Sequence, residues 1–349
     1  MARKLLWASL ALAPATIVVD LVAHPGKVAL FVLAAVSLVP LAWLIGESTE
    51  HAAVHTGPGI GGFLNASFGN APELIIALFA VGDGLPNVVR GSLAGSVVSN
   101  ILLVLGFALA VGTDNARLDR RSLLVQLGLV AFAVVLFLVP AVPGFSGNPE
   151  RRSLVLLSIP VAVVLLLVYL ATTARGLRRH SRMHTASEHE KNRGGWSLPL
   201  ALAVLAAATG ATAFISEVLV HSLDAFAHAA GLSQFFISAV IVAIVGNAAE
   251  HGGAVVIAAR GKMPLATEIA ISSSAQVGLL VVPAIVLLSL FFSNPLPLSF
   301  RPVELAAMGG AAAFVGFVLA DGRARRWEGW LLIGVYAGVA AGFLAAGDR

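Results

Sequence analysis

The stretch Gly69-Asn70-Ala71-Pro72-Glu73 reappears as Gly246-Asn247-Ala248-Ala249-Glu250, 177 residues further along the chain. Each copy lies inside a long apolar segment, where a carboxylate is costly to bury. A carboxylate that serves only as a hydrogen-bond link between helices would not require the same five-residue frame twice. We therefore predict that Glu73 and Glu250 form one functional site.

The composition places the chain in a membrane. Of its 349 residues, 58% are hydrophobic and 11% are charged, and the mean hydropathy is +0.92. A soluble domain carries about 25% charged residues. The absence of Cys from the sequence excludes disulfides and thiolate metal sites. The isoelectric point near 10.0 reflects basic residues in short loops, so the sequence predicts a lipid partner and no nucleic-acid partner.

Eleven apolar segments are long enough to cross a bilayer, which takes about 20 residues as a helix. We expect helices throughout, because lipid offers the backbone no hydrogen-bond partners. The predicted fold class is all-α, a polytopic membrane protein with about eleven transmembrane helices. The predicted segments are 5–22, 27–50, 60–81, 87–111, 122–140, 153–173, 198–221, 233–259, 264–292, 302–320 and 327–346.

Basic residues predict the orientation. With the N-terminus in the cytoplasm, 16 of the 22 Lys and Arg residues fall on the cytoplasmic side. This bias matches the excess of Lys and Arg that cytoplasmic loops carry. The sequence thus predicts a multi-pass protein with its N-terminus inside and its C-terminus outside. The short, alanine-rich chain predicts a prokaryotic inner membrane, and an organelle membrane is the alternative. It defines no oligomeric state.

The repeat extends beyond the five-residue motif. With the same offset, Gly95-Ser96-x-x-Ser99 aligns with Ser272-Ser273-x-x-Gln276. Five segments per repeat is an odd number, so the second copy must enter from the opposite side, as in many secondary transporters. We predict an extra N-terminal helix (1–26), a first five-helix repeat (27–173), a cytoplasmic linker (174–196) and a second five-helix repeat (197–349). The linker is polar, and a regulatory role for it is the alternative to a simple connection.

The residues around the two acids predict a divalent cation. Carboxylate, amide and hydroxyl oxygens without sulfur suit Ca²⁺, with Mn²⁺ close behind. Two carboxylates also balance two positive charges. The predicted metal ligands are Glu73, Glu250, Asn70 and Asn247, and the supporting residues of the ion pathway are Ser96, Ser99, Ser273, Gln276, Glu50 and Glu217. For the serines the alternative is helix packing. For Glu50 and Glu217 it is a position at a helix end or interface.

The same two carboxylates predict coupling to protons. Without a cation, Glu73 and Glu250 facing each other in apolar surroundings cannot both stay ionised at low cost. The site would hold either one divalent cation or protons, which is the basis of antiport. His251 follows Glu250 directly and is predicted to be proton-linked. A packing histidine is the alternative. No cofactor is expected, since calcium and protons are the transported ions.

Two stretches resemble a known family. The sequences GGFLNASFGNAPELIIALFA (61–80) and GSLAGSVVSNILLVLG (91–106) are similar to the first conserved region of CAX-type calcium/proton antiporters. The sequence from Ile244 to Pro283, with GNAAEH and a downstream SS-x-x-Q, resembles the second region. The resemblance implies eleven helices, calcium/proton exchange at Glu73 and Glu250, and alternating access by sliding of spans 2 and 7 against the remaining bundle. It also implies that Glu50 and Glu217 line the ion's route.

Two departures and three rivals accompany this resemblance. The 174–196 loop is basic where family members often carry acidic residues, and Pro72 resembles the motif of sodium/calcium exchangers. A sodium-driven exchanger is therefore the first alternative, although its site would need more hydroxyl groups to coordinate the ions. A cation channel is a weaker one, because channels commonly build acidic rings from symmetric subunits. An enzyme is not predicted, since the sequence has no nucleophile–base pairing, phosphate loop or HExxH motif.

Overall fold

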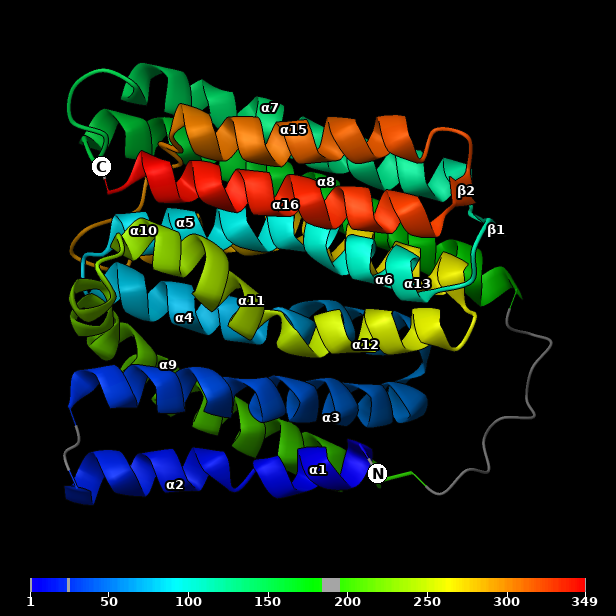
Figure 1. Ribbon diagram of the computed structural model, residues 1–349, viewed down its shortest axis with the longest axis horizontal. Helices are drawn as coiled ribbons and strands as arrows, with labels where there is room; N and C mark the ends of the chain where they lie inside the picture. The colour runs from blue at the N-terminus through cyan, green and yellow to red at the C-terminus, as the bar shows by residue number, and fades with distance from the viewer. Residues whose placement is uncertain (1, 24–25, 184–194, 349) are drawn as a thin grey trace.

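The computed structural model describes residues 2–23, 26–183 and 195–348, and these are almost entirely helical (Figure 1). The N-terminal half comprises α1 (Ala2–Ser9), α2 (Leu12–Val18), η1 (Val19–Ala23), α3 (Lys27–Gly69), α4 (Ala71–Gly82), α5 (Pro86–Val98), η2 (Ser99–Val104), α6 (Leu105–Val111), β1 (Ala116–Arg117), α7 (Arg120–Gly144) and α8 (Arg152–Met183). The C-terminal half comprises α9 (Leu198–Ala230), α10 (Gln234–Phe236), η5 (Ile237–Val242), α11 (Ala243–Gly246), α12 (Ala248–Ala259), α13 (Met263–Gln276), η6 (Val277–Val281), α14 (Val282–Ser289), α15 (Pro302–Val318), β2 (Arg323–Ala324) and α16 (Arg326–Ala346). Elements named η are π-helical turns within longer helices.

All eleven predicted segments are largely helical, which confirms the fold class. Among the described residues, eight helices are long and apolar enough to cross a membrane, and a bent helix pair raises this number to nine. The pair is Gln234–Gly246 and Glu250–Ala259, which meet at 58°. The two other predicted segments correspond to the shorter apolar helices α4 and α15. A count of eleven transmembrane helices therefore stays a prediction.

Helix α3 contains the second predicted segment and the first half of the third, because it turns back on itself. In a straight helix, Ala53 and Gly61 would lie about 12 Å apart along the axis. Here a Cβ added to Gly61 would lie 2.6 Å from the Cβ of Ala53. The chain therefore reverses between these residues, as Figure 1 shows at the end of α3. The third predicted segment consists of α4 together with the part of α3 that follows the reversal.

The linker differs from its prediction in one respect. Helix α8 continues to Met183, ten residues into the segment 174–196 that we predicted as a linker. Residues 184–194 lie outside the described part of the chain. The first and last described residues lie at opposite ends of the helices (Figure 1), as the predicted odd number of spans requires.

Matching backbone conformations relate the two halves. Gly84 and Gly261, again 177 residues apart, both adopt positive φ, at 68° and 80°. Asn70 and Asn247 end one helix and start the next with almost the same backbone angles, φ −96° and ψ 12° against φ −94° and ψ 7°. A π-helical turn also follows Ser96 in the first half and its equivalent Ser273 in the second. These shared irregularities support a duplicated five-segment unit.

The strand pairing supports the inversion of the second unit. β1 and β2 form an antiparallel pair in which Ala116 faces Ala324. β1 follows α6, whereas the equivalent connection in the second half, between α14 and α15, lies at the opposite end of the bundle (Figure 1). Equivalent connections therefore sit at opposite ends, as an inverted repeat requires.

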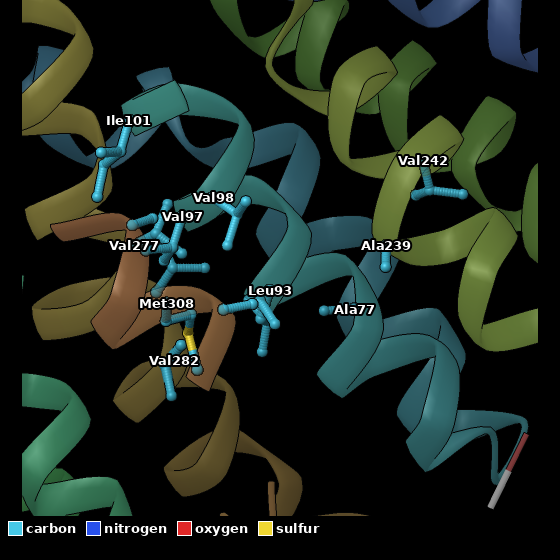
Figure 2. Packing of buried hydrophobic residues seen from close by; sticks show 14 of the residues in the cluster. Ala77, Leu93, Val97, Val98, Ile101, Ala239, Val242, Val277, Val282 and Met308 are labelled. Atoms are coloured by element: carbon cyan, nitrogen blue, oxygen red, sulfur yellow. The ribbon is translucent and has the colours of Figure 1, made fainter. Parts of the chain in front are cut away.

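Helix α5 forms the centre of the bundle. Every residue from Val88 to Val98 is buried, as expected of a helix enclosed on all sides. Figure 2 shows Leu93 and Val97 of α5 packed among side chains from α14, α15 and η6. Gly95 permits a close approach of the second repeat, because an added Cβ would lie 2.6 Å from the carbonyl carbon of Ala239. The central helix of one repeat is thus packed against the other repeat.

The contact between α6 and α16 depends on glycine. A Cβ added to Gly329 would lie 2.5 Å from the carbonyl oxygen of Gly106 and from the backbone nitrogen of Ala110. We expect Gly329→Ala to lower the free energy of unfolding by roughly 1–3 kcal/mol, because backbone atoms cannot move aside as a flexible side chain can. Gly334→Ala, on the same helix but facing open space, is the control. Thermal unfolding in detergent measures both, and equal unfolding temperatures for the two variants would contradict this packing.

Candidate functional site

Each acidic residue lies in the first turn of a short helix that begins after a break. Asn70 separates α3 from α4, and Asn247 separates α11 from α12. Glu73 and Glu250 are the third residues of α4 and α12. The backbone N–H groups of a helix's first turn lack partners within the helix and favour negative charge. The breaks therefore place two helix N-termini, each with a carboxylate, inside the bundle.

The two motifs face each other through their glycines. A Cβ added to Gly69 would lie 3.3 Å from Oε1 of Glu250, and a Cβ added to Gly246 would lie 3.4 Å from Cγ of Glu73. Each carboxylate thus packs against the glycine of the opposite repeat. A larger residue at either glycine would push the opposite side chain away. The duplicated Gly of the motif makes room for the duplicated Glu.

The two asparagines also reach across the repeats. The Asn70 amide donates to Oε1 of Gln276 at 3.0 Å, and the Asn247 amide donates to the hydroxyl of Ser96 at 2.9 Å. Neither side chain caps its own helix. The structure therefore brings the predicted amide and hydroxyl residues of each repeat to the motif of the other.

The two carboxylates have different surroundings. Glu73 is 6% exposed, and neither of its carboxylate oxygens has a hydrogen-bond partner in another described residue. Glu250 is less completely buried and accepts a short hydrogen bond from the hydroxyl of Ser273. The side-chain oxygen of Asn247 is also buried without a donor. Buried oxygens that lack donors are suited to coordinating a hard cation.

Sequence reasoning missed Asn100. Its amide nitrogen donates to the hydroxyl of Ser273 at 3.0 Å, and its carbonyl oxygen lies 2.9 Å from Nε2 of His251. The one available signal was a buried-type amide in the apolar run Gly91–Gly106. His251 therefore contacts Asn100, and a chain of hydrogen bonds through Asn100 and Ser273 connects the His251 ring to the Glu250 carboxylate.

Three predicted pathway residues lie apart from these contacts. The hydroxyl of Ser99 donates to the carbonyl oxygen of Ser96, one turn earlier in the same helix. Glu50 of α3 is exposed and Glu217 of α9 is partly exposed. Within the described ranges, no three His, Cys, Asp or Glu side chains converge as a metal-binding group. The candidate site therefore consists of two carboxylates and neutral oxygens.

Helices α3 and α9 are fastened together at one end of the bundle. At the end where the C-terminus lies, Phe31 of α3 stacks on Phe226 of α9 with ring centroids 4.3 Å apart. Nearby, Nε2 of His221 lies 3.2 Å from the carboxylate of Asp83. Near the other end, Val54 of α3 is 64% exposed. Helix α3 is also held at this end, where His51 stacks on Trp196, two residues before α9, with ring centroids 4.6 Å apart.

A large cavity lies elsewhere. It has a volume of about 630 Å³ and is lined by residues of α4, α5, α8 and the connection before α15, among them Leu85, Glu150 and Asn294. Neither Glu73 nor Glu250 contributes to it. This cavity is therefore separate from the carboxylate site.

Two inverted helical repeats that each contribute a carboxylate to a common buried site define a class of protein, the secondary transporters of cations. The family model for sodium/calcium exchanger proteins matches residues 26–175 and 200–345. The chain belongs to this family.

Relatives and solved structures agree with this assignment. The chain is 38% identical over 340 residues to the Ca²⁺/H⁺ antiporter ChaA of Bacillus subtilis, with 95% of each chain covered. It is 34% identical to the Ca²⁺/H⁺ antiporter of Aphanothece halophytica, over 92% of this chain and 91% of that protein. The structure of native YfkE matches with a TM-score of 0.83 and 36% identity, over 97% of this chain and 99% of that chain.

Proposed function

We propose that this protein exchanges Ca²⁺ for protons across a membrane by alternating access. The observation that carries the proposal is the pair Glu73 and Glu250, contributed by opposite repeats and packed against each other's motif glycines. Relatives that match along almost the whole chain are named Ca²⁺/H⁺ antiporters. The proposed role is transport, with no chemical conversion of a substrate and no cofactor.

In this proposal, Glu73 and Glu250 bind the cation directly. Asn70 and Asn247 hold the two helix breaks and offer amide oxygens. Ser96, Ser273 and Gln276 hold those amides and Glu250 in place through the hydrogen bonds described above. Two carboxylates in apolar surroundings need positive charge or protons as partners. Ca²⁺ and protons therefore compete for one site, and this competition couples their movements.

The proposed moving elements are α3 and α9. Their contact at Phe31 and Phe226 closes one end, and separation there would open the site to that side. The basic residues support a cytoplasmic N-terminus, so the end at Phe31 and Phe226 would face outward. Glu50 and Glu217 lie on these helices and would line the route of the ion.

A sodium-driven exchanger is the second candidate. The fold alone would permit it, because a sodium–calcium exchanger structure matches with a TM-score of 0.56 at 21% identity. The local structure disfavours it. The nearby oxygens of Ser96, Ser273 and Gln276 are already engaged in hydrogen bonds, which leaves few neutral oxygens for several Na⁺ ions.

Transport in proteoliposomes tests the proposal. We expect ⁴⁵Ca²⁺ uptake that requires a proton gradient, is accompanied by a matching change of internal pH, and is unchanged when Na⁺ replaces K⁺ on both sides. Vesicles without protein are the control for leakage. Uptake that follows a Na⁺ gradient and leaves internal pH unchanged would establish the second candidate instead. Steady Ca²⁺ current without any counter-ion would establish a channel.

A further inference from the structure

We propose that Asn100 is a positioning residue that holds the carboxylate of Glu250 through Ser273 and leaves Glu73 as the carboxylate that moves. The inference rests on the proposed function, since it assigns different tasks to the two acids of that site. Asn100 lies in η2 of the first repeat, whereas Ser273 and Glu250 belong to the second. One repeat therefore positions the ion-binding acid of the other.

The contacts form a chain of hydrogen bonds. Asn100 is 1% exposed, so its amide has no access to water and must be satisfied by protein groups. Its carbonyl oxygen lies 2.9 Å from Nε2 of His251, and its nitrogen donates to the Ser273 hydroxyl at 3.0 Å. That hydroxyl in turn donates to Oε2 of Glu250.

The direction of each bond in this chain follows when Glu250 is ionised, as it is in the cation-binding form. When Glu250 is ionised its carboxylate only accepts, so the Ser273 hydroxyl uses its single hydrogen for Glu250. The bond from Asn100 then has to reach a lone pair of the hydroxyl oxygen, which requires the NH₂ group of the amide. The carbonyl oxygen of the amide consequently faces His251, whose Nε2 must carry a hydrogen. Replacing Asn100 with an apolar residue would release the Ser273 hydroxyl from this orientation.

Among the described residues, the other repeat has no equivalent chain of hydrogen bonds. The position equivalent to Asn100 is Val277, which is completely buried among apolar side chains (Figure 2). The equivalent of Ser273 is Ser96, and its hydroxyl accepts from the Asn247 amide. Neither oxygen of Glu73 has a partner in another described residue. The sequence repeat is symmetric at the acids, but the hydrogen bonds that support them are not.

This asymmetry has a mechanical consequence. A carboxylate held by a hydrogen bond and a supporting amide loses little further conformational freedom when it binds a cation, whereas an unrestrained one must be ordered. Glu250 is therefore the preorganised ligand, and Glu73 completes the coordination by changing its rotamer. Loss of the support should weaken cation binding more than it slows the conformational change of the bound carrier.

A double-mutant cycle tests this inference. The variants are Asn100→Val, Ser273→Ala and the two together, each assayed for the KM and maximal rate of proton-driven ⁴⁵Ca²⁺ uptake. Loss of a buried hydrogen bond predicts a KM about tenfold higher for each single variant, with a smaller change of maximal rate. Because both substitutions act through one chain of hydrogen bonds, the KM of the double variant should also rise about tenfold and not about a hundredfold.

Ser274→Ala is the matched control. Its hydroxyl donates to the carbonyl oxygen of Val97 at 3.1 Å, so this variant also loses a buried hydrogen bond between the repeats, but away from Glu250. Its KM should stay within about twofold of the parent, as expected when packing tolerates the loss. If Asn100→Val does not reconstitute, Asn100→Ser replaces it, because serine stays polar but is too short to span His251 and Ser273.

Three results would overturn the inference. They are an Asn100 variant with the parent's KM, a KM of the double variant that equals the product of the two single effects, or a rise of KM in Ser274→Ala as large as that in Asn100→Val. These results differ from a failure of the proposed function. A parent protein that takes up no Ca²⁺ under a proton gradient would refute the exchange activity itself, whereas active parent protein with a normal Asn100 variant refutes only the positioning role.

Discussion

Glu73→Gln and Glu250→Gln are each expected to lower proton-driven ⁴⁵Ca²⁺ uptake by at least about 100-fold. Glutamine keeps the shape of the side chain but removes one of two negative charges that balance the cation and one site that can take up a proton. Breaking a buried charge pair by removing one partner costs about 3–5 kcal/mol, which corresponds to a factor of about 100 or more in binding. Initial uptake rates in proteoliposomes measure the effect.

The Gln variants should remain folded. Glu73 has no hydrogen-bond partner in another described residue, so its substitution removes an unsupported buried carboxylate and breaks no ion pair within the described part of the chain. Glu268→Gln is the control, because it makes the same substitution at an exposed position on α13. Either buried variant retaining half of the parent's rate, while the control behaves as the parent, would refute the two-carboxylate site.

A cross-link between Phe31→Cys and Phe226→Cys is expected to abolish exchange, with less than about a tenth of the parent's rate remaining. The two rings stack at 4.3 Å, and in the proposed mechanism α3 and α9 separate there to open the site to that side. A covalent cross-link would keep the two helices together, so the conformational change that opens the site could not occur. The chain contains no native Cys, so a short thiol-specific cross-linker acts only at the introduced pair. Uptake before cross-linking, after it and after reduction is the measurement.

Two controls separate locking from damage. Each single Cys variant treated with the same reagent should keep the rate of its untreated form. A cross-link between Ala116→Cys and Ala324→Cys, which face each other in the β1–β2 pair, joins elements other than α3 and α9 and should leave uptake intact. Full activity of the cross-linked Phe31/Phe226 pair would show that these helices need not separate at this end.

Much of the fold follows from patterns that are local in the sequence. Apolar segments of sufficient length predict helices wherever water is absent, and all eleven predicted segments are largely helical. The duplicated frame around Glu73 and Glu250, together with five segments per repeat, predicted two copies with opposite orientation. The reversal within α3 at residues 53–61 also fell in a predicted break, where Gly57, Pro58 and Gly59 follow one another.

The site was predictable in part for a related reason. A carboxylate or amide inside an apolar segment is recognisable because burying it costs free energy. This cost allowed the sequence to predict Glu73, Glu250, Asn70 and Asn247. Serine carries a weaker signal, because its hydroxyl can bond to a carbonyl of its own helix. Ser99 does so, whereas Ser96 and Ser273 bond across the repeats. The sequence does not separate these cases.

The sequence by itself determined the membrane environment, the inverted repeat and the pair of acids, because apolar length, repeat spacing and the cost of buried charge are properties of the residues themselves. Only the tertiary structure decided which acid is supported. Asn100 and Ser273 are 173 residues apart, and their hydrogen bond exists because α13 lies against η2 at that level of the bundle. Repeats that match in sequence at the acids thus differ in hydrogen bonding, since a hydrogen bond depends on distances of a few tenths of an ångström that only the packed helices define.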